Sequence, residues 1–163
     1  MELPSNVLTD MEIDAIVKTL EIPNYLGTIM SDEVHGYKPD NDVCAVINLE
    51  PKSMQGTHWT AFATIGPKSY YFDSYGTSPP QNLIKYLKTN NDYENNNPTI
   101  YCNALVVQHT GNSNCGALSI FVLYYLTRGV DYDHILKYLR HHRLNPTLWI
   151  TKNHLPPKNG KFN

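Results

Sequence analysis

The sequence predicts an α+β fold in which a small mixed or antiparallel sheet packs against one buried helix. Three observations support this prediction. A segment near the N-terminus has apolar residues at helical spacing, residues 58–64 alternate as a strand does, and residues 117–126 are almost entirely apolar. With 163 residues, the chain is expected to form a single domain over residues 1–163.

The first predicted helix covers residues 10–20. Thr9 and Glu12 have the Ser/Thr-x-x-Glu spacing of a capping box, and Pro23 stops the helix soon after its end. The apolar residues at helical spacing are Ile13, Ile16, Val17 and Leu20. Residues 27–42 are rich in Gly, Pro, Asp and Ser and show little periodicity, so we expect a surface loop there.

The central part of the chain predicts a buried strand followed by a hairpin. Residues 43–49 form a short apolar run with β-branched members, which is typical of a buried strand. Residues 58–64 and 70–74 flank a Gly-Pro-Lys-Ser turn and predict two antiparallel strands. In such a hairpin the start of one strand lies beside the end of the other. His58 and Asp73 are therefore expected to be neighbours.

The second half of the chain contains three predicted helices and one strand. Pro79 or Pro80 is expected to open a helix, because a proline in the first turn loses no hydrogen bond. Residues 100–107 predict a further strand, and a polar turn then leads to a helix that begins at Cys115. That helix is apolar almost all round, so it is expected to be the central element. A last amphipathic helix is predicted over residues 131–142, followed by a loosely ordered tail.

Composition and charge exclude several classes of protein. The chain has no run of eighteen apolar residues and no basic leader, so neither a membrane span nor a secretory signal is expected. Its three cysteines lack Cys-x-x-Cys spacing, which favours a reducing intracellular compartment over a disulfide framework. Residues 1–133 carry 7 Lys/Arg and 15 Asp/Glu, a net charge of −8, whereas residues 134–163 carry 6 Lys/Arg and no acid, a net charge of +6.

The chemistry is expected to centre on residues 108–116, a polar, Gly-containing turn that delivers Cys115 to the start of the apolar helix. At a helix N-terminus the aligned peptide dipoles and free N–H groups favour a thiolate, the nucleophilic form of cysteine. His58 is predicted to be the general base, and Asp73 to orient its imidazole. The side-chain amide of Gln108 and the backbone N–H of Cys115 are predicted to form an oxyanion hole.

Each of these residues also has a structural alternative. Cys115 is a free cysteine, and free cysteines are usually buried for packing. Asp73 has the position of a residue that caps the turn after a strand. His109 is the nearest rival to His58 as the base, but it has no obvious carboxylate partner in the sequence. Gln108 lies on a predicted loop, where a glutamine is generally just solvated.

The remaining cysteines and several histidines are assigned no chemistry. Cys44 and Cys102 are expected to be core cysteines in strands. His141 and His142 are adjacent on the predicted last helix, where neighbouring side chains point about 100° apart. Together with His134 they do not readily face one ion, so no metal site is predicted.

The candidate residues resemble the adenain family of adenovirus-type cysteine endopeptidases and, more distantly, the proteases that process ubiquitin-like modifiers. The shared pattern is His-Trp at 58–59, an acidic residue within Phe-Asp-Ser-Tyr-Gly at 72–76, and Gln108 seven residues before Cys115 and its following glycine. Matching non-catalytic context extends the resemblance over about residues 10–128. Each element alone is weak evidence, whereas the four in this order are specific.

The resemblance implies a papain-like core in circularly permuted order, because papain-type chains place the cysteine before the histidine. It also implies a monomeric thiol endopeptidase that processes viral structural precursor proteins at Gly-containing sites, in the host cell nucleus and the virion. Adenain-type enzymes use DNA, and the adenovirus enzymes use an activating viral peptide, although the chemistry itself requires no cofactor. Trp59 is either a wall over the narrow channel that accepts small substrate residues or a core aromatic.

Two departures from the family pattern leave other functions open. Asp73 stands where the adenovirus enzymes typically have Glu, and Asp is usual in the modifier proteases. An isopeptidase acting on a ubiquitin-like modifier is therefore the first alternative. The chain is also shorter than the adenovirus enzymes. A catalytically silent binding module with the same fold is the second alternative, disfavoured because none of the four polar residues is missing.

The basic C-terminal segment is the candidate for DNA binding. Lys137, Arg140 and Arg143 recur at three-residue steps and so form a stripe along one side of the predicted last helix. Such a stripe can contact phosphates, which the resemblance to DNA-using enzymes suggests. The alternative is a basic helix and tail that are simply solvated.

Overall fold

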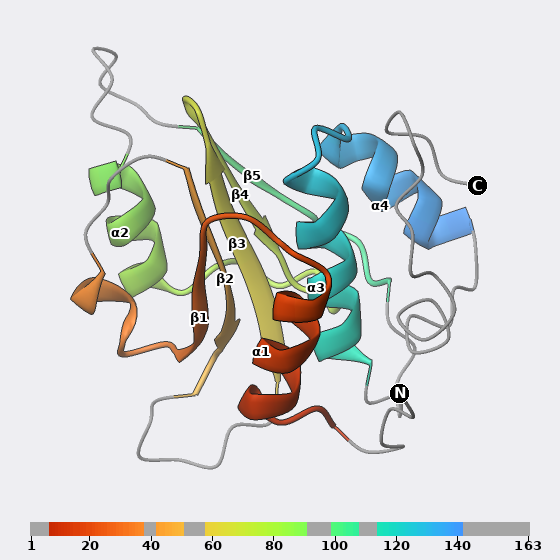
Figure 1. Ribbon diagram of the computed structural model, residues 1–163. Helices are drawn as coiled ribbons and strands as arrows, with labels where there is room; N and C mark the ends of the chain where they lie inside the picture. Colours follow the sequence, from red (N-terminus) through yellow and green to blue (C-terminus); the bar gives the residue numbers. More distant parts are fainter. Residues whose placement is uncertain (1–6, 38–41, 51–57, 91–98, 108–113, 142–163) are drawn as a thin grey trace.

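The computed structural model describes residues 7–37, 42–50, 58–90, 99–107 and 114–141. These residues form a mixed five-stranded sheet with helices on both faces (Figure 1). The prediction of an α+β fold with a small mixed sheet and a buried central helix is confirmed. No helix within the described ranges is long and apolar enough to cross a membrane.

The strands follow one another across the sheet in chain order, β1-β2-β3-β4-β5. Their bounds are Tyr25–Met30 for β1, Val43–Asn48 for β2, Trp59–Ile65 for β3, Lys68–Phe72 for β4 and Ile100–Cys102 for β5. The three central strands, β2, β3 and β4, pair antiparallel with one another, whereas the edge strands β1 and β5 pair in parallel with β2 and β4. The predicted hairpin is thus the β3–β4 pair.

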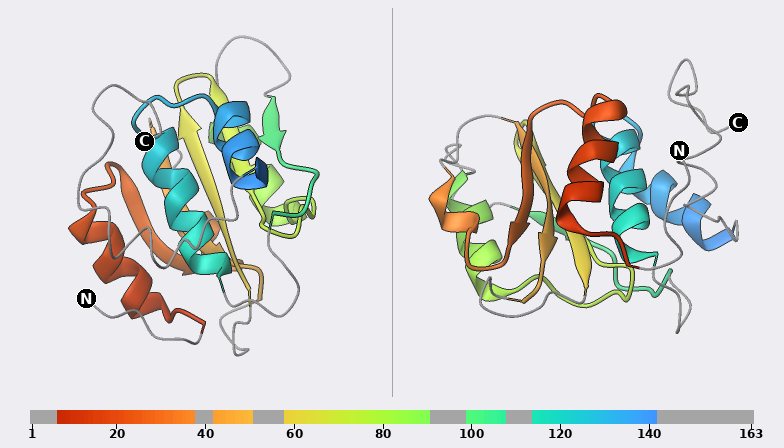
Figure 2. Two further views of the ribbon diagram at one scale, coloured as in Figure 1. Left: turned by 90° about the vertical axis from the view of Figure 1, so that its right-hand side faces the viewer. Right: turned by 60° about the horizontal axis from the view of Figure 1, so that its bottom comes forward.

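The helices lie in two layers, one on each face of the sheet. The bounds are Asp10–Thr19 for α1, Gln81–Asn90 for α2, Cys115–Leu126 for α3 and Tyr132–His141 for α4, with a short 3₁₀ turn η1 at Val34–Gly36. Figure 1 shows α1, α3 and α4 on one face, and α2 with η1 on the other. Helices α1 and α3 lie side by side (Figure 2). The predicted helices are therefore present, with ends that differ by one or two residues.

Strand β3 carries the two-sided pattern that the sequence predicts. Trp59, Ala61 and Ala63 belong to the larger apolar cluster under α1, α3 and α4. Phe62 belongs to the second cluster, under α2 and η1. Both faces of β3 are buried because a helical layer covers each of them, so alternation here separates two cores rather than a core from solvent.

The capping box of α1 is present as predicted. The Glu12 backbone N–H donates to Thr9 Oγ1 at 3.2 Å, and the Thr9 backbone N–H donates to Glu12 Oε2 at 2.7 Å. The helix then contributes a longer-range contact, because Asp14 accepts hydrogen bonds from the backbone N–H and the hydroxyl of Thr28 at 3.0 and 2.6 Å. These bonds tie α1 to strand β1.

The prediction of a surface loop over residues 27–42 is wrong in its first half. Strand β1 pairs in parallel with β2, but the register shifts between Tyr25 and Thr28. Gly27 lies in that shift with φ of 136°, a backbone conformation that favours glycine. The irregularity interrupts the period-2 pattern that would have marked the strand. The 3₁₀ turn η1 follows.

The predicted strand over residues 100–107 is also too long, since β5 ends at Cys102. Its partner β4 ends at Phe72, and the last paired residues are Tyr71 and Cys102. Beyond this point Asn103 bonds to the backbone through its side chain instead. The predicted tail after residue 142 lies outside the described residues.

Helix α3 is the buried centre of the fold, as its composition predicts, and every residue from Cys115 to Leu126 is buried. Its start packs closely on β3 and α1. A Cβ added at Gly116 would lie 3.3 Å from Ile13 Cδ1 and from Trp59 Cδ1. The Trp59 side chain cannot move away from such a Cβ freely, because its indole N–H donates to the Leu8 carbonyl at 2.7 Å.

Gly116→Ala is therefore expected to destabilise the fold by about 1 kcal/mol and to lower activity, because the added methyl group overpacks the start of α3. Urea unfolding measures the change in the free energy of unfolding. Gly36→Ala is the matched control, since a Cβ there meets nothing within 4 Å, and its stability should stay within about 0.5 kcal/mol of wild type. Equal stability of both variants would contradict the close packing.

Candidate active site

Three secondary-structure elements bring the candidate catalytic residues to one end of the sheet. His58 directly precedes β3, Asp73 directly follows β4, and Cys115 is the first residue of α3. Because β3 and β4 are antiparallel, with Ala61 opposite Phe72, the start of one lies beside the end of the other. Helix α3 packs on the same end of β3, as Figure 2 shows. The predicted hairpin geometry is thus the geometry of the site.

His58 and Asp73 form a hydrogen-bonded pair. The distance from His58 Nε2 to Asp73 Oδ1 is 2.7 Å, and their side chains are 17% and 1% exposed. Burial by itself raises the pKa of Asp73, but hydrogen bonds from His58, Thr77 and the Tyr75 backbone N–H outweigh it and lower the pKa below its ordinary value. The carboxylate is therefore ionised and can only accept, so His58 Nε2 carries the donated proton.

The side chain of Cys115 lies close enough to His58 to raise the pKa of the imidazole, together with Asp73. Because Nε2 is bound to Asp73, Nδ1 is the ring nitrogen that remains for the thiol. Burial lowers the pKa of His58, but the hydrogen bonds and charges of Asp73 and Cys115 outweigh it and raise the pKa from 6.5 to about 9. The ring of Tyr75 covers the imidazole, with centroids 4.8 Å apart. The imidazole thus bridges an acid and a thiol.

Cys115 occupies the first position of α3 and is 3% exposed. The preceding residue, Asn114, makes no side-chain cap hydrogen bond, so it does not occupy the N–H groups of the first turn. These N–H groups and the helix dipole stabilise negative charge at the start of the helix. An arrangement of carboxylate, imidazole and thiol at a helix start is chemically suited to nucleophilic attack by sulfur.

No family model and no curated protein sequence matches the chain. Solved structures do match it. The ASFV pS273R protease aligns with a TM-score of 0.60 and 18% identity, over 91% of this chain and 67% of its own. The SUMO protease Ulp1 with its catalytic cysteine oxidised to a sulfonic acid aligns with a TM-score of 0.51 and 16% identity, over 90% of this chain and 78% of its own. The chain has a cysteine protease fold.

A second Ulp1 structure, with the cysteine oxidised to a sulfinic acid, gives a TM-score of 0.50 and 16% identity over 93% of this chain and 80% of its own. At identities this low the likeness establishes the fold. The narrower resemblance to the adenain family remains a prediction from the sequence.

The raised pKa of His58 predicts a pH window for stability. Between pH 6.5 and about 9 the folded protein keeps the imidazolium while the unfolded chain loses it. The contribution of His58 to the free energy of unfolding is thus complete below pH 6.5 and is lost as the pH rises to about 9. Urea unfolding of wild type and His58→Ala at several pH values measures this. Parallel pH dependences would contradict it.

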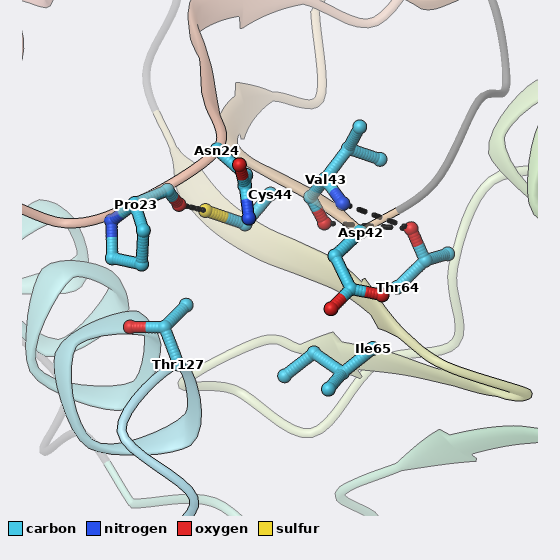
Figure 3. Close-up of a pocket in the computed structure, with 8 residues that line it drawn as sticks. All are labelled: Pro23, Asn24, Asp42, Val43, Cys44, Thr64, Ile65 and Thr127. Carbon is cyan, nitrogen blue, oxygen red and sulfur yellow. Dashed lines mark hydrogen bonds between the residues drawn. The ribbon is translucent and has the colours of Figure 1, made fainter.

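The other two cysteines lie in different surroundings. Cys44 is buried in β2, as predicted, and its thiol donates to the Pro23 carbonyl at 3.4 Å beside a cavity that Thr64 and Thr127 also line (Figure 3). Burial raises the pKa of Cys44 to about 12, so it stays a thiol. The prediction that Cys102 is a core cysteine is wrong, because Cys102 is exposed at the end of edge strand β5.

The remaining predicted site residues are placed as follows. Trp59 is buried in the core cluster under α3, bonded to Leu8, which agrees with the core alternative and leaves its role toward substrate a prediction. Lys137 and Arg140 are exposed on α4. Gln108 and Arg143 lie outside the described residues, as do His109 and His142.

Asp73 caps the turn that follows it, as its structural alternative predicted, but three groups that support it were not named from the sequence. Thr77 donates its hydroxyl to Asp73 Oδ2, the Tyr75 backbone N–H donates to Oδ1 at 2.9 Å, and Asn103 bonds to the Asp73 backbone. The Ser-Tyr-Gly-Thr turn after Asp73 could have indicated the first two, because an aspartate before such a turn commonly accepts from residues two to four positions later. Nothing local marks Asn103, which is thirty residues away.

Proposed function

We propose that the chain is a cysteine endopeptidase in which Cys115 is the nucleophile, His58 the general base and Asp73 the orienting acid. The observation that carries this proposal is the imidazole bonded to the Asp73 carboxylate and lying beside Cys115 at the start of α3, on a cysteine protease fold. A solely structural cysteine would need neither a histidine partner nor a place at a helix start.

The proposed reaction follows from the roles of the two ring nitrogens. The thiol proton resides on His58 Nδ1, so that an imidazolium pairs with the thiolate, and the sulfur attacks the carbonyl carbon of the scissile peptide bond. The backbone N–H of Cys115 and the amide of Gln108 are the proposed donors to the oxyanion. His58 then gives its proton to the leaving amine, and water hydrolyses the thioester. Asp73 stabilises the imidazolium throughout and fixes the tautomer.

The proposed substrates are viral structural precursor proteins, cut at Gly-containing sites. The support is the adenain-like sequence pattern together with the shared fold of the ASFV protease. In this proposal the enzyme works in the host cell nucleus and in the virion, and an activating viral peptide is an additional partner. Trp59 then borders the channel for the small residues before the scissile bond.

Removal of a ubiquitin-like modifier is the second candidate function. It is favoured by the shared fold of the SUMO protease Ulp1 and by Asp73 as the acid. The two candidates use the same chemistry and differ in what lies beyond the scissile bond. Only the recognised partner separates them.

Active-site-directed probes test these proposals. A short peptide that ends in Gly-Gly-vinyl sulfone should label Cys115, as mass spectrometry of the digested protein would show, and Cys115→Ser should remain unlabelled. A SUMO-vinyl sulfone probe that labels Cys115 much faster than the short peptide would favour the modifier protease. Failure of both probes to label Cys115 would favour the silent binding module.

DNA is proposed as a further partner, bound by the basic stripe of Lys137, Arg140 and Arg143. Lys137 and Arg140 are exposed on α4, which agrees with a surface role, and the stripe lies within the +6 segment. Affinity for non-specific duplex DNA should fall steeply with salt, because each contact releases counterions from the phosphates. A Lys137, Arg140 and Arg143 triple alanine variant should lower the log–log salt slope by about one per lost contact.

Fluorescence anisotropy with labelled duplex DNA at several salt concentrations measures the slope. Lys85→Ala with Lys88→Ala is the control, since both lysines are exposed on α2, on the opposite face of the sheet. The control should bind as wild type does. Absence of binding at low salt, or an unchanged slope in the triple variant, would remove DNA from the proposal.

A further inference from the structure

Asn103 lies where the pairing between β4 and β5 ends. The register pairs Tyr70 with Tyr101 and Tyr71 with Cys102, and the strand stops there. Asn103 is 5% exposed, and its side-chain amide bonds to both backbone groups of Asp73. Asn103 Oδ1 accepts from the Asp73 N–H at 3.0 Å, and Nδ2 donates to the Asp73 carbonyl at 2.5 Å. The side chain thus replaces the strand pairing that the backbone no longer supplies.

The segment that follows Asn103 is attached to the turn after Asp73 at two further points. The Val107 N–H donates to the Ser74 carbonyl at 2.9 Å. Gly76, with φ of 71°, approaches the backbone of Ala104 so closely that a Cβ would lie 3.0 Å from the Ala104 carbonyl group. The acid-bearing turn and residues 103–107 are therefore held together, and the latter lead on toward the Cys115 helix.

The direction of a side chain is set by its backbone, and Asp73 follows the last residue of β4, where strand pairing no longer fixes it. The donors to its carboxylate from Tyr75 and Thr77 belong to the same turn and move with it. Among the described residues outside the turn, Asn103 is the one that holds both Asp73 backbone groups. Its planar amide offers one donor and one acceptor side by side, which matches a peptide unit.

We propose that Asn103 is a positioning residue for the catalytic acid, holding the Asp73 backbone so that its carboxylate meets His58 Nε2. The proposal rests on the proposed protease function for its catalytic consequence, whereas the Asp73–His58 pairing can be measured without it. Alanine at this position removes the Asn103 acceptor from the Asp73 N–H and leaves the Asp73 carbonyl with the Gly76 N–H at 2.8 Å. Aspartate keeps the shape but replaces the donor by an acceptor and adds a like charge beside Asp73.

The experiment compares wild type with Asn103→Ala, Asn103→Asp and Asn82→Ala. Asn82 is the matched control, because its amide also joins two backbone segments, donating to the Ser31 carbonyl and accepting from the Leu83 N–H, but on α2. The first readout is the pKa of His58 from an NMR titration of its ring nitrogens, with the signals assigned by their loss in His58→Ala. Within the described part of the chain, Asp73, Cys115 and Tyr75 are the groups that lie against this ring, and all three remain in every variant.

In Asn103→Ala the pKa of His58 should fall from about 9 toward 6.5, and in both Asn103 variants kcat should fall by roughly a hundredfold with little change in KM. The Asn82 variant should lose some thermal stability but keep the His58 pKa and kcat. Asn103→Ser, whose hydroxyl can serve one of the two backbone groups, should fall between wild type and Asn103→Ala.

An unchanged pKa of His58 in folded Asn103→Ala would overturn the proposal, even if thermal stability were lower, because Asp73 would then be positioned without the amide. If Asn103→Ala fails to fold, Asn103→Ser provides the same comparison. A wild-type protein that cleaves no peptide would refute the proposed function alone, since the NMR titration requires no catalysis.

Discussion

Replacing Cys115 by alanine should abolish peptide cleavage while the fold is retained. The sulfur is the atom that forms the bond to the substrate in the proposed reaction, and the described residues around it offer no second nucleophile in contact with His58. We expect kcat/KM to fall at least about a hundredfold, which corresponds to about 2.7 kcal/mol of transition-state stabilisation. Because Cys115 is buried, the small cavity should also cost about 1 kcal/mol of stability.

Cleavage of a Gly-Gly peptide substrate measures the loss, and circular dichroism with urea unfolding checks the fold. Cys102→Ala is the control, because this thiol is exposed on edge strand β5 and should be dispensable. A Cys115→Ala variant that keeps more than about one hundredth of wild-type activity would identify another nucleophile. A comparable loss in the Cys102 variant would point to that thiol instead.

His58→Ala should be nearly as damaging as loss of the thiol, and Asp73→Asn less so. The imidazole takes and returns the proton, and loss of a general base or acid typically costs about 10²- to 10⁴-fold. The carboxylate only orients and stabilises the ring. In Asp73→Asn, where the side chain is a neutral amide, the ring can still pair with the sulfur. The measured kcat/KM of Asp73→Asn should therefore lie below that of wild type but above that of His58→Ala.

The structure adds a second effect to the Asp73 variant. The buried carboxylate accepts bonds from His58, Tyr75 and Thr77, and an amide can offer these three donors only one oxygen. Asp73→Asn should thus lose stability as well as activity, and urea unfolding separates the two. If Asp73→Asn were less active than His58→Ala at equal foldedness, the carboxylate would have a chemical role beyond orientation.

Local patterns in the sequence were sufficient for much of the fold. The capping box at Thr9 and Glu12, the alternation from Trp59 to Ala63 and the apolar run of α3 each express an interaction within a few residues. Such patterns depend on helix and strand periodicity alone. The pairing of His58 with Asp73 then followed from the predicted hairpin, because a short turn fixes the register of the two strands.

Elements that depend on distant partners were not predictable in this way. Strand β1 exists because β2 offers a parallel edge, and its shifted register at Gly27 hides the strand pattern. Strand β5 ends at Cys102 because β4 ends beside it, which also places Cys102 on the surface. The support of Asp73 by Asn103 joins residues thirty positions apart, and no local rule connects them.

The sequence by itself determined which residues carry the candidate chemistry and in what order: His58, Asp73 and Cys115, on elements whose local patterns define them. Only the tertiary structure decided that the imidazole bonds to the acid beside Cys115, and that an amide from another segment holds the backbone of the acid. The reason is physical. Periodicity, capping and turn chemistry act over a few residues, whereas the distances on which catalysis depends are set by packing between segments far apart in the chain.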